Sequence, residues 1–494
     1  MLFSSFLTLL VFSTFTSPTV NSTDSDNKLI HETEDKSSII GHSILINRLG
    51  ILVLSFVLIL FINSLNIISL IPGFTLFNSW FSFTSYNLPL IILIILLIIG
   101  LLIYNTSLSS KNKESTLLSP YLILLVLANS IGLLLFPLVN DLLALYIIVE
   151  LQSYSLYLLT GLHNRSYNAS RASLLYFLMG GVASAIILLA SYFIYSLTGS
   201  TNLSDISIFY SLVSNSTEGG YIDNAYTYFD ILLIALFFKM GLAPLHRWSI
   251  AVYNYAPTYI TAYISIVAKI SISSWIFTNA IFFNHHIFII FFYLSLFIGS
   301  YKPLYQINIK TILAYSGLLN FGYILLSIIT FDISFYIYII QYTLTHIILF
   351  LSILAASQYI SKPISIWSPL IYIHQLKLPN LTLAICMILA LFSLIGIPPL
   401  PGFYAKLYIL ISALQENYIL ESLILIVCSV IATYYYANII KVLITSRTIK
   451  ENISQSNNNI NVSLAYVIAT ATVLLISFFI FLPFISEGLY LITI

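Results

Sequence analysis

Residues 236–248, with the sequence LFFKMGLAPLHRW, decide the fold. The stretch begins as an apolar run typical of a membrane-spanning helix, yet Lys239 lies inside the run and Pro244 follows it. Proline interrupts a helix because it lacks an amide proton and its ring clashes with the preceding turn. A charged side chain in the hydrocarbon core of a bilayer is costly, so its presence indicates a functional group. The stretch therefore predicts a broken membrane helix that carries a functional cation.

The whole chain around this stretch has the composition of a membrane protein. Of its 494 residues, 59% are hydrophobic and only 7% are charged, whereas a soluble domain carries about 25% charged residues. The formal net charge of +1 gives no reason to expect a nucleic-acid partner. The chain has two cysteines, Cys386 and Cys428, too few for an iron–sulfur cluster, which takes about four thiolates. These features exclude a water-soluble fold and a cysteine-ligated redox site, and no metal site is expected.

Apolar runs long enough to cross a bilayer recur along the chain. A crossing takes roughly 20 residues, and the runs predict about fourteen spans. The predicted spans cover residues 2–20, 44–68, 87–105, 119–139, 141–161, 173–197, 229–248, 256–280, 284–301, 309–331, 334–358, 380–413, 418–444 and 463–487. The expected fold class is an all-α polytopic membrane protein, with prolines breaking the seventh and twelfth spans.

The charges of the loops alternate between the two ends of the predicted spans. Lysine and arginine follow the odd-numbered spans, as at Lys111, Arg165 and Lys310, whereas the loops after even-numbered spans carry acids. This is the pattern of the positive-inside rule, which places both termini on the opposite, outer side. A polar loop predicted at 21–43 departs from the pattern with five acids, although acids contribute little to orientation.

A small set of ionisable groups remains inside or at the edge of the spans: Glu150, Lys239, Lys269, Lys406, His246 and His346. One reading is structural, with a buried lysine–glutamate pair holding two helices together, but it leaves two lysines without a carboxylate. Burial disfavours the charged form of a lysine, so such a group can take up and release a proton. Lysines on separate helices, joined by water, histidines and hydroxyls, predict a lateral proton relay. Each histidine could serve the relay, gate it or make a structural hydrogen bond.

The two broken spans occupy matching positions in two units of five spans, the fourth to eighth and the ninth to thirteenth. Lys239 precedes Pro244 in one, and Lys406 follows Pro401 in the other. An odd number of helices gives the two units opposite topology, so an inverted repeat is expected, with an ion site at the breaks. The predicted divisions are an N-terminal part, two repeats and a C-terminal part: 1–118, 119–280, 284–444 and 445–494.

Other polar residues in the spans have plainer interpretations. Asn320 could support water, but such groups more often join helix to helix by hydrogen bonds. The tyrosines 434–436 are interpreted as packing and membrane-belt residues. Neither is expected among the relay groups.

Three segments carry a resemblance to a known family: ELQSYSLYLL at 150–159, FFKMGLAPLHRWSIAVYNYAPT at 237–258 and FSLIGIPPLPGFYAKLYIL at 392–410. They resemble the antiporter-like membrane subunits of respiratory complex I. By that resemblance Glu150 and Lys239 match the family's glutamate–lysine pair. Lys269 and Lys406 match its lysines in the eighth and twelfth spans, and His246 matches its histidine in the turn. Ala251 is a departure, because relatives often carry an acid there.

The resemblance implies proton pumping driven by quinone reduction elsewhere in a complex. The implied location is the mitochondrial inner membrane, with both termini in the intermembrane space. No cofactor is expected on this chain, since NADH, FMN, iron–sulfur clusters and ubiquinone would belong to partner subunits. The implied partners are other membrane-arm and accessory subunits of complex I and the lipid bilayer, with cardiolipin as a candidate lipid. A subunit of a cation/proton antiporter is the alternative, because that family shares the fold.

Overall fold

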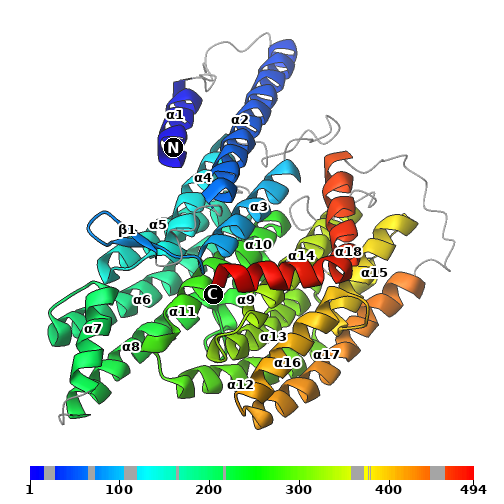
Figure 1. Ribbon diagram of the computed structural model, residues 1–494. Coiled ribbons are helices and arrows are strands. Elements are labelled where there is room, and N and C mark those ends of the chain that lie inside the picture. The colour runs from blue at the N-terminus through cyan, green and yellow to red at the C-terminus, as the bar shows by residue number, and fades with distance from the viewer. Residues whose placement is uncertain are drawn as a thin grey trace.

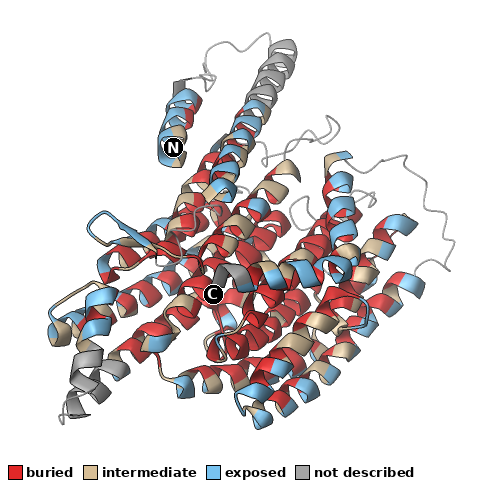
Figure 2. Cartoon of the chain, in the orientation of Figure 1, coloured by how far each residue is buried: buried red, intermediate tan, exposed pale blue. Residues whose placement is uncertain are grey.

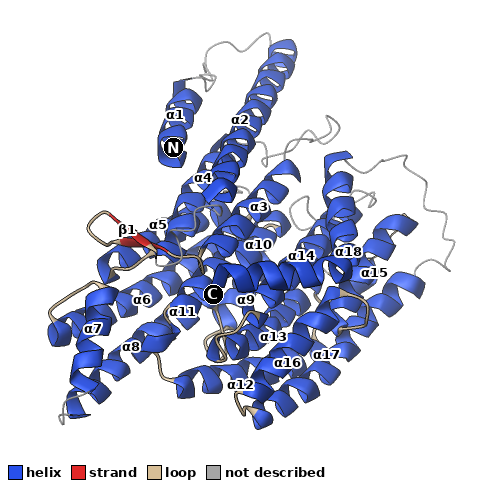
Figure 3. Cartoon of the chain, in the orientation of Figure 1, coloured by secondary structure: helices blue, strands red, loops and turns tan. Residues whose placement is uncertain are grey.

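The computed structural model describes residues 1–15, 28–64, 73–104, 120–162, 166–214, 219–357, 372–376, 378, 380–445 and 462–493. Within these residues the protein is almost entirely helical (Figure 3). Ten helices of the described chain are long and apolar enough to cross a membrane. The prediction of a helical, polytopic membrane protein is therefore confirmed.

The first part of the chain, drawn from blue to green in Figure 1, contains a short hairpin among its helices. Its elements are α1 (Leu2–Phe15), α2 (Lys28–Ser64), β1 (Phe74–Leu76), β2 (Phe81–Phe83), α3 (Leu88–Tyr104), α4 (Pro120–Leu135), η4 (Phe136–Leu138), α5 (Leu142–Gly161), α6 (Tyr167–Thr198), α7 (Leu203–Ser214), α8 (Gly219–Met240), α9 (Arg247–Tyr255), α10 (Thr258–Tyr263), η5 (Ile264–Ala268) and α11 (Lys269–Thr278). Here η4 is a 3-10 turn, whereas η5 is a π-helical turn between α10 and α11.

The second part of the chain, drawn from green to red, is helical throughout its described residues. Its elements are η6 (Ala280–Phe282), α12 (His285–Tyr301), η7 (Lys302–Tyr305), α13 (Ile309–Ile329), α14 (Ser334–Ser357), η8 (Ile373–Gln375), α15 (Leu381–Ile395), α16 (Pro401–Gln415), α17 (Ile419–Thr445) and α18 (Val462–Thr493). The predicted spans overlap α1–α6, α8 and α10–α18, and the sequence analysis anticipated neither α7 nor α9.

The polar loop predicted at 21–43 is wrong for its second part, because α2 begins at Lys28. Oppositely charged residues lie four positions apart here, as Lys28 and Glu32 do, and this spacing favours a helix. Residues 21–27 lie outside the described residues, as do Lys111 and Arg165.

The hairpin of β1 and β2 was also not predicted; it lies between the spans predicted at 44–68 and 87–105. Its strands pair antiparallel, with Phe74 opposite Phe83. The backbone amide of Asn140 donates to the carbonyl of Trp80 at 2.8 Å, which fastens the hairpin to the start of α5. Aromatic residues on both strands suit a pleated strand, and this local preference favours the hairpin.

The interior of the molecule is formed by the helices of the chain's middle. In one apolar 18-residue window of each span, the buried share of residues is 100% within Thr258–Thr278, 94% within Ile309–Ile329 and 89% within Ser334–Ala356, against 33% within Tyr167–Thr198. Figure 2 shows the same contrast, with buried residues concentrated toward the centre and exposed ones on the outer helices. The polar groups on α11, α13 and α14 are therefore enclosed by protein.

Both predicted breaks begin at a glycine. Gly241 follows α8 with a φ of +68°, and Gly396 follows α15 with a φ of +95°. Only glycine adopts this left-handed region without steric cost, so each helix ends where its glycine stands. Prolines after each glycine prevent the helix from resuming at once. The irregular span predicted at 380–413 is thus a helix, a turn and a second helix, α15 with α16, whereas the span predicted at 229–248 covers the end of α8, the turn and only Arg247 and Trp248 of α9.

Candidate functional site

The ionisable residues predicted for the relay lie on separate helices, with Glu150 on α5, Lys239 on α8, Lys269 on α11 and Lys406 on α16. The side chains of Lys239 and Glu150 are 8% and 16% exposed. Lys269 is 5% exposed and stands in the enclosed interior. The fold therefore holds Lys239 and Lys269 away from bulk water, leaves Lys406 part-buried and gives each lysine a different set of neighbours.

Lys239 and Glu150 form a loose pair. The Lys239 Nζ is 3.9 Å from the Glu150 Oε1, which is an ion-pair distance but too long for a hydrogen bond. The same Nζ donates to the Ser153 Oγ at 2.7 Å. Ser153 lies three residues after Glu150 on α5, so both point from one helix face toward α8. The Ser153 hydroxyl thus stabilises the Lys239 ammonium by a direct hydrogen bond, and the Glu150 carboxylate stabilises it electrostatically without one.

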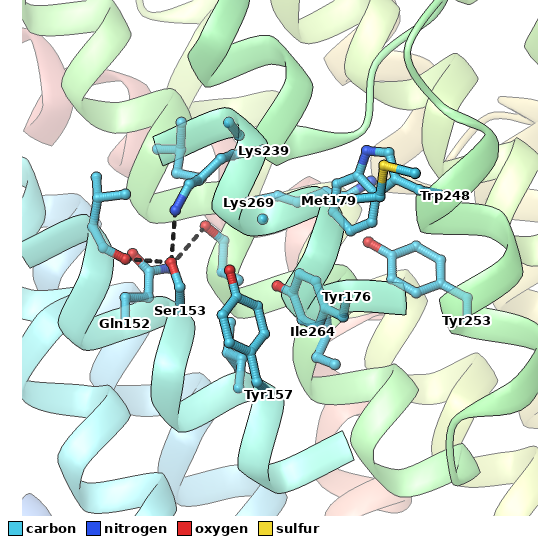
Figure 4. Close-up of a pocket in the computed structure, with 16 residues that line it drawn as sticks. Gln152, Ser153, Tyr157, Tyr176, Met179, Lys239, Trp248, Tyr253, Ile264 and Lys269 are labelled. Atoms are coloured by element: carbon cyan, nitrogen blue, oxygen red, sulfur yellow. Dashed lines mark hydrogen bonds between the residues drawn. The ribbon is translucent and has the colours of Figure 1, made fainter. Parts of the chain in front are cut away.

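A pocket joins the first two lysines. The side chains of both Lys239 and Lys269 line it. Figure 4 shows the two lysines at one pocket, together with Ser153, Tyr157 and Tyr253. Polar cavities of sufficient size hold water that bridges buried groups. The arrangement can therefore pass protons between Lys239 and Lys269 through hydroxyls and water.

A glycine on α6 makes room for one of these hydroxyls. A Cβ at Gly180 would lie 1.7 Å from the Tyr157 hydroxyl oxygen. Only a residue without a side chain lets Tyr157 occupy its place at the pocket. The glycine's role in the structure is thus to admit a tyrosine from α5.

Lys269 is surrounded by aromatic rings. Its Nζ lies 4.9 Å from the ring centroid of Phe321 and 5.3 Å from that of Tyr253. The faces of aromatic rings attract cations, although less strongly than a carboxylate does. The π-helical turn η5 ends immediately before Lys269, and such turns are frequent at functional sites. Lys269 is thus a buried amine whose charged form has only modest support.

Lys406 is held by the second break itself. Its Nζ donates to the carbonyls of Leu394 and Ile395 at 2.9 and 3.0 Å. These carbonyls close α15, and the last carbonyls of a helix carry partial negative charge. The Nζ also lies 5.6 Å from the Tyr323 ring centroid. Here the unwound turn supplies carbonyl acceptors to a lysine.

The two histidines differ in surroundings. His246 lies in the first break, where its Nδ1 is 3.1 Å from the carbonyl oxygen of Pro244. His346 lies in the interior of α14, where its Nδ1 is 3.2 Å from the Tyr342 carbonyl oxygen. The His346 Nε2 is buried and has no hydrogen-bond partner within the described chain. His246 is thus bonded within its own turn, while His346 keeps one nitrogen for a further contact.

Lys310 was assigned to a basic loop, and that assignment is wrong. It stands in the first turn of α13, is 5% exposed and donates from its Nζ to the Ala256 carbonyl at 2.8 Å. The contact joins residues 54 positions apart, so no local sequence pattern reveals it. Ser153 was also missed, although its position one turn from Glu150 offered a signal.

Comparisons with known proteins agree with these features. The family model described as "NADH:quinone oxidoreductase/Mrp antiporter, TM" matches residues 139–433. NADH-ubiquinone oxidoreductase chain 2 of Debaryomyces hansenii is 60% identical over 493 residues, covering 100% of each chain. The matched range contains all the predicted relay residues, from Glu150 to Lys406.

Solved structures share the fold at low sequence identity. A chain of respiratory complex I from Thermus thermophilus superposes with a TM-score of 0.74, at 21% identity and 99% and 98% coverage of the two chains. A chain of the Mrp complex from Dietzia sp. gives a TM-score of 0.76, at 18% identity and 100% and 95% coverage. These two likenesses establish the fold alone. The 60% identity over the full length and the matching family model show that the chain belongs to the NADH-ubiquinone oxidoreductase chain 2 family.

Proposed function

We propose that this chain is a proton-translocating membrane subunit of respiratory complex I, and that Glu150, Lys239, Lys269 and Lys406 carry its protons. The observation that supports this most directly is the pocket shared by Lys239 and Lys269. A purely structural pair would need neither a second lysine at the same pocket nor a third at the second break. The chemistry of these buried groups is acid–base chemistry, and electron transfer from NADH to ubiquinone takes place in other subunits.

The proton path runs along the chain of buried lysines. Protons enter from the basic, matrix side toward Lys239 and Lys269, pass sideways to Lys406 and leave on the outer side. Glu150 acts as the switch, because a nearby carboxylate favours the charged form of Lys239. When the carboxylate moves beyond its 3.9 Å separation, the ammonium loses that support and releases its proton toward the pocket. His246 and His346 relay protons or gate their passage.

We further propose an architecture of fourteen spans with two inverted five-helix repeats, at residues 119–280 and 284–444. The repeats are flanked by an N-terminal part at 1–118 and a C-terminal part at 445–494. The matched breaks support this division, since each has a glycine with positive φ followed by at least one proline.

The chain belongs, in this proposal, to the mitochondrial inner membrane with both termini in the intermembrane space. Its partners are the other membrane-arm and accessory subunits, and cardiolipin is a candidate lipid at its surface. NADH, FMN, the iron–sulfur clusters and ubiquinone bind to partner subunits, and this chain holds no cofactor or metal. The charge alternation of the loops supports the orientation.

The direct test replaces Lys239 and, separately, Lys269 by methionine in the assembled complex reconstituted into vesicles. Both variants should lose proton pumping, because methionine keeps the length of the side chain without a titratable amine. Lys441→Met is the matched control, since Lys441 is exposed at the end of α17 and should pump normally. Full pumping in both buried variants would reject the relay.

A cation/proton antiporter subunit remains the second candidate, favoured by the fold shared with the Mrp complex chain. The two functions differ in what the chain assembles with. Native membranes separated by mild electrophoresis should show the chain co-migrating with NADH dehydrogenase activity. Migration apart from that activity, with cation-dependent proton exchange, would establish the antiporter instead.

A further inference from the structure

A buried asparagine joins α4, α5 and α10 beside the pocket and is separate from the relay groups. Asn129 on α4 is 0% exposed. Its Oδ1 accepts from the Tyr263 hydroxyl at 2.7 Å. Its Nδ2 donates to the Gln152 carbonyl at 2.9 Å and to the Ser155 Oγ at 2.8 Å. Displacing any of these helices would leave a buried polar group unpaired, which is costly. One side chain therefore fastens α10 to α5.

Both ends of this connection lie next to groups of the candidate site. Tyr263 is the last residue of α10, and the π-helical turn η5 follows it directly. On α5, Gln152 directly precedes Ser153, whose hydroxyl accepts from Lys239. Asn129 thus joins the beginning of η5 to the part of α5 that contacts the first lysine.

The Gln152 side chain reaches the other end of the turn. Its Nε2 is 3.5 Å from the carbonyl oxygen of Ala268, the last residue of η5, and 3.3 Å from the Ser271 Oγ. These distances are long for hydrogen bonds, but all three residues are buried, so water competes little. Figure 4 shows Gln152 and Lys269 at the same pocket. One residue of α5 is therefore connected to both ends of η5.

The turn needs such contacts because its hydrogen bonding departs from that of an α-helix. Each amide in a π-helix donates to the carbonyl five residues back, and the irregular winding costs some backbone hydrogen bonding. All residues of η5, Ile264–Ala268, are buried. The Ser265 carbonyl accepts from the Tyr342 hydroxyl of α14 at 3.2 Å, and the Ala268 carbonyl faces Gln152. Side chains of two neighbouring helices thus supply donors to the turn.

The winding of η5 determines where Lys269 points. An α-helical winding of its five residues would turn this side chain by roughly 100° about the helix axis. The Lys269 Nζ now lies 5.3 Å from the Tyr253 ring centroid, and the side chain lines the pocket together with Lys239. A rotation of that size would carry the amine away from both neighbours.

We propose that Asn129 and Gln152 are positioning residues, which fasten the π-helical turn η5 to α5 and so keep the Lys269 amine directed into the pocket that it shares with Lys239. Neither side chain carries a proton, and both act through Lys269. The proposal rests on the proposed function, because the direction of this amine affects pumping only if the amine takes part in proton transfer.

The first experiment separates positioning from stability. Asn129→Leu or Tyr263→Phe alone leaves a buried polar partner unpaired and should lower the amount of assembled complex on native gels. The double variant removes both partners and should restore much of it. Its pumping per assembled complex should still be about tenfold low, because misplacing a reacting group by about 1 Å can cost roughly 100-fold. Full pumping by the double variant would overturn the proposal.

The matched control is Tyr259→Phe, one turn earlier on α10. The Tyr259 hydroxyl donates to the Leu101 carbonyl of α3 at 3.1 Å, and the residue is 4% exposed. Its removal loosens the same helix without breaking a contact to α5, so pumping per assembled complex should remain normal. A loss as large as that of the double variant would overturn the proposal, because loosening α10 anywhere would then suffice.

The second experiment observes the amine itself. A structure of the assembled double variant should show η5 rewound and the Lys269 side chain turned out of the pocket. An unchanged turn with an unchanged lysine would overturn the proposal, whatever the pumping rate.

Failure of this proposal can be told apart from failure of the proposed function. If Lys269→Met stops pumping while the double variant keeps its turn and pumps like the control, the relay stands and the positioning role is rejected. If Lys269→Met pumps fully, the proposed function is rejected, and the positioning of Lys269 for proton transfer is rejected with it.

Discussion

The two breaks in the fold begin alike, with a glycine at positive φ, yet they treat their lysines differently. Before the first break, Lys239 reaches across to α5, where it finds Ser153 at 2.7 Å and Glu150 at 3.9 Å. After the second break, Lys406 folds back onto the carbonyls of Leu394 and Ile395. One lysine thus depends on a titratable partner, and the other on fixed backbone dipoles. The difference suits a switch at one end of the relay and a steady acceptor at the other.

The largest expected effect comes from filling the second break. A Cβ at Gly402 would lie 1.6 Å from the carbonyl oxygen of Ser393, a backbone atom that cannot swing aside. Gly402→Ala should therefore cost about 3 kcal/mol or more of stability, the upper range for overpacking a core. The amount of assembled complex on native gels measures the effect.

The control for that substitution is Gly100→Ala on α3, where a Cβ would meet nothing within 4 Å in the described structure. Normal assembly of Gly402→Ala would show that the second break is not rigid. The contrast between a fixed and a switchable lysine would then lose its basis.

The next effect tests the switch directly. Glu150→Gln removes the charge near Lys239 and should slow turnover and pumping together by about tenfold, equivalent to about 1.4 kcal/mol of activation free energy. Glu421→Gln is the matched control, because Glu421 lies on α17 and accepts from the Tyr293 hydroxyl of α12 at 2.9 Å. Turnover and pumping equal to the control would remove the switching role of Glu150.

The smallest expected effect concerns the pocket between Lys239 and Lys269. Gly180→Ala would push the Tyr157 hydroxyl from its place, because the flexible end of that side chain can yield. Pumping should fall by about threefold, the loss of roughly one hydrogen bond, while assembly remains normal. The neighbouring Gly181→Ala meets nothing within 4 Å in the described chain and serves as control. Equal pumping by the two would show that Tyr157 has no part in the path.

The helices and the candidate relay residues were accessible from sequence because both leave local signals. Apolar runs indicate membrane spans. Lys239, Lys269 and Lys406 can be identified because each is a charged residue within such a run. The glycine and proline punctuation at Gly241 and Pro244 marks a break in the same local way.

What the sequence could not predict depends on contacts between distant elements. The burial of Lys310 depends on the Ala256 carbonyl, and the acceptors of Lys406 are backbone atoms that no side-chain pattern reveals. Tyr435 and Tyr436 differ from Tyr434 only in the direction in which α17 turns them. The direction in which each side chain faces follows from the packing of the whole fold, so a short stretch of sequence does not reveal it.

The π-helical turn before Lys269 makes the direction of this side chain depend on how many residues the turn contains. A turn that holds one additional residue rotates everything after it by roughly 100° relative to an unbroken α-helix. Deleting one residue from Ile264–Ala268 would restore an even winding and leave every side-chain identity from Lys269 onward unchanged. The amine would keep nearly its present direction, whereas an α-helical winding of all five residues would turn it by roughly 100°.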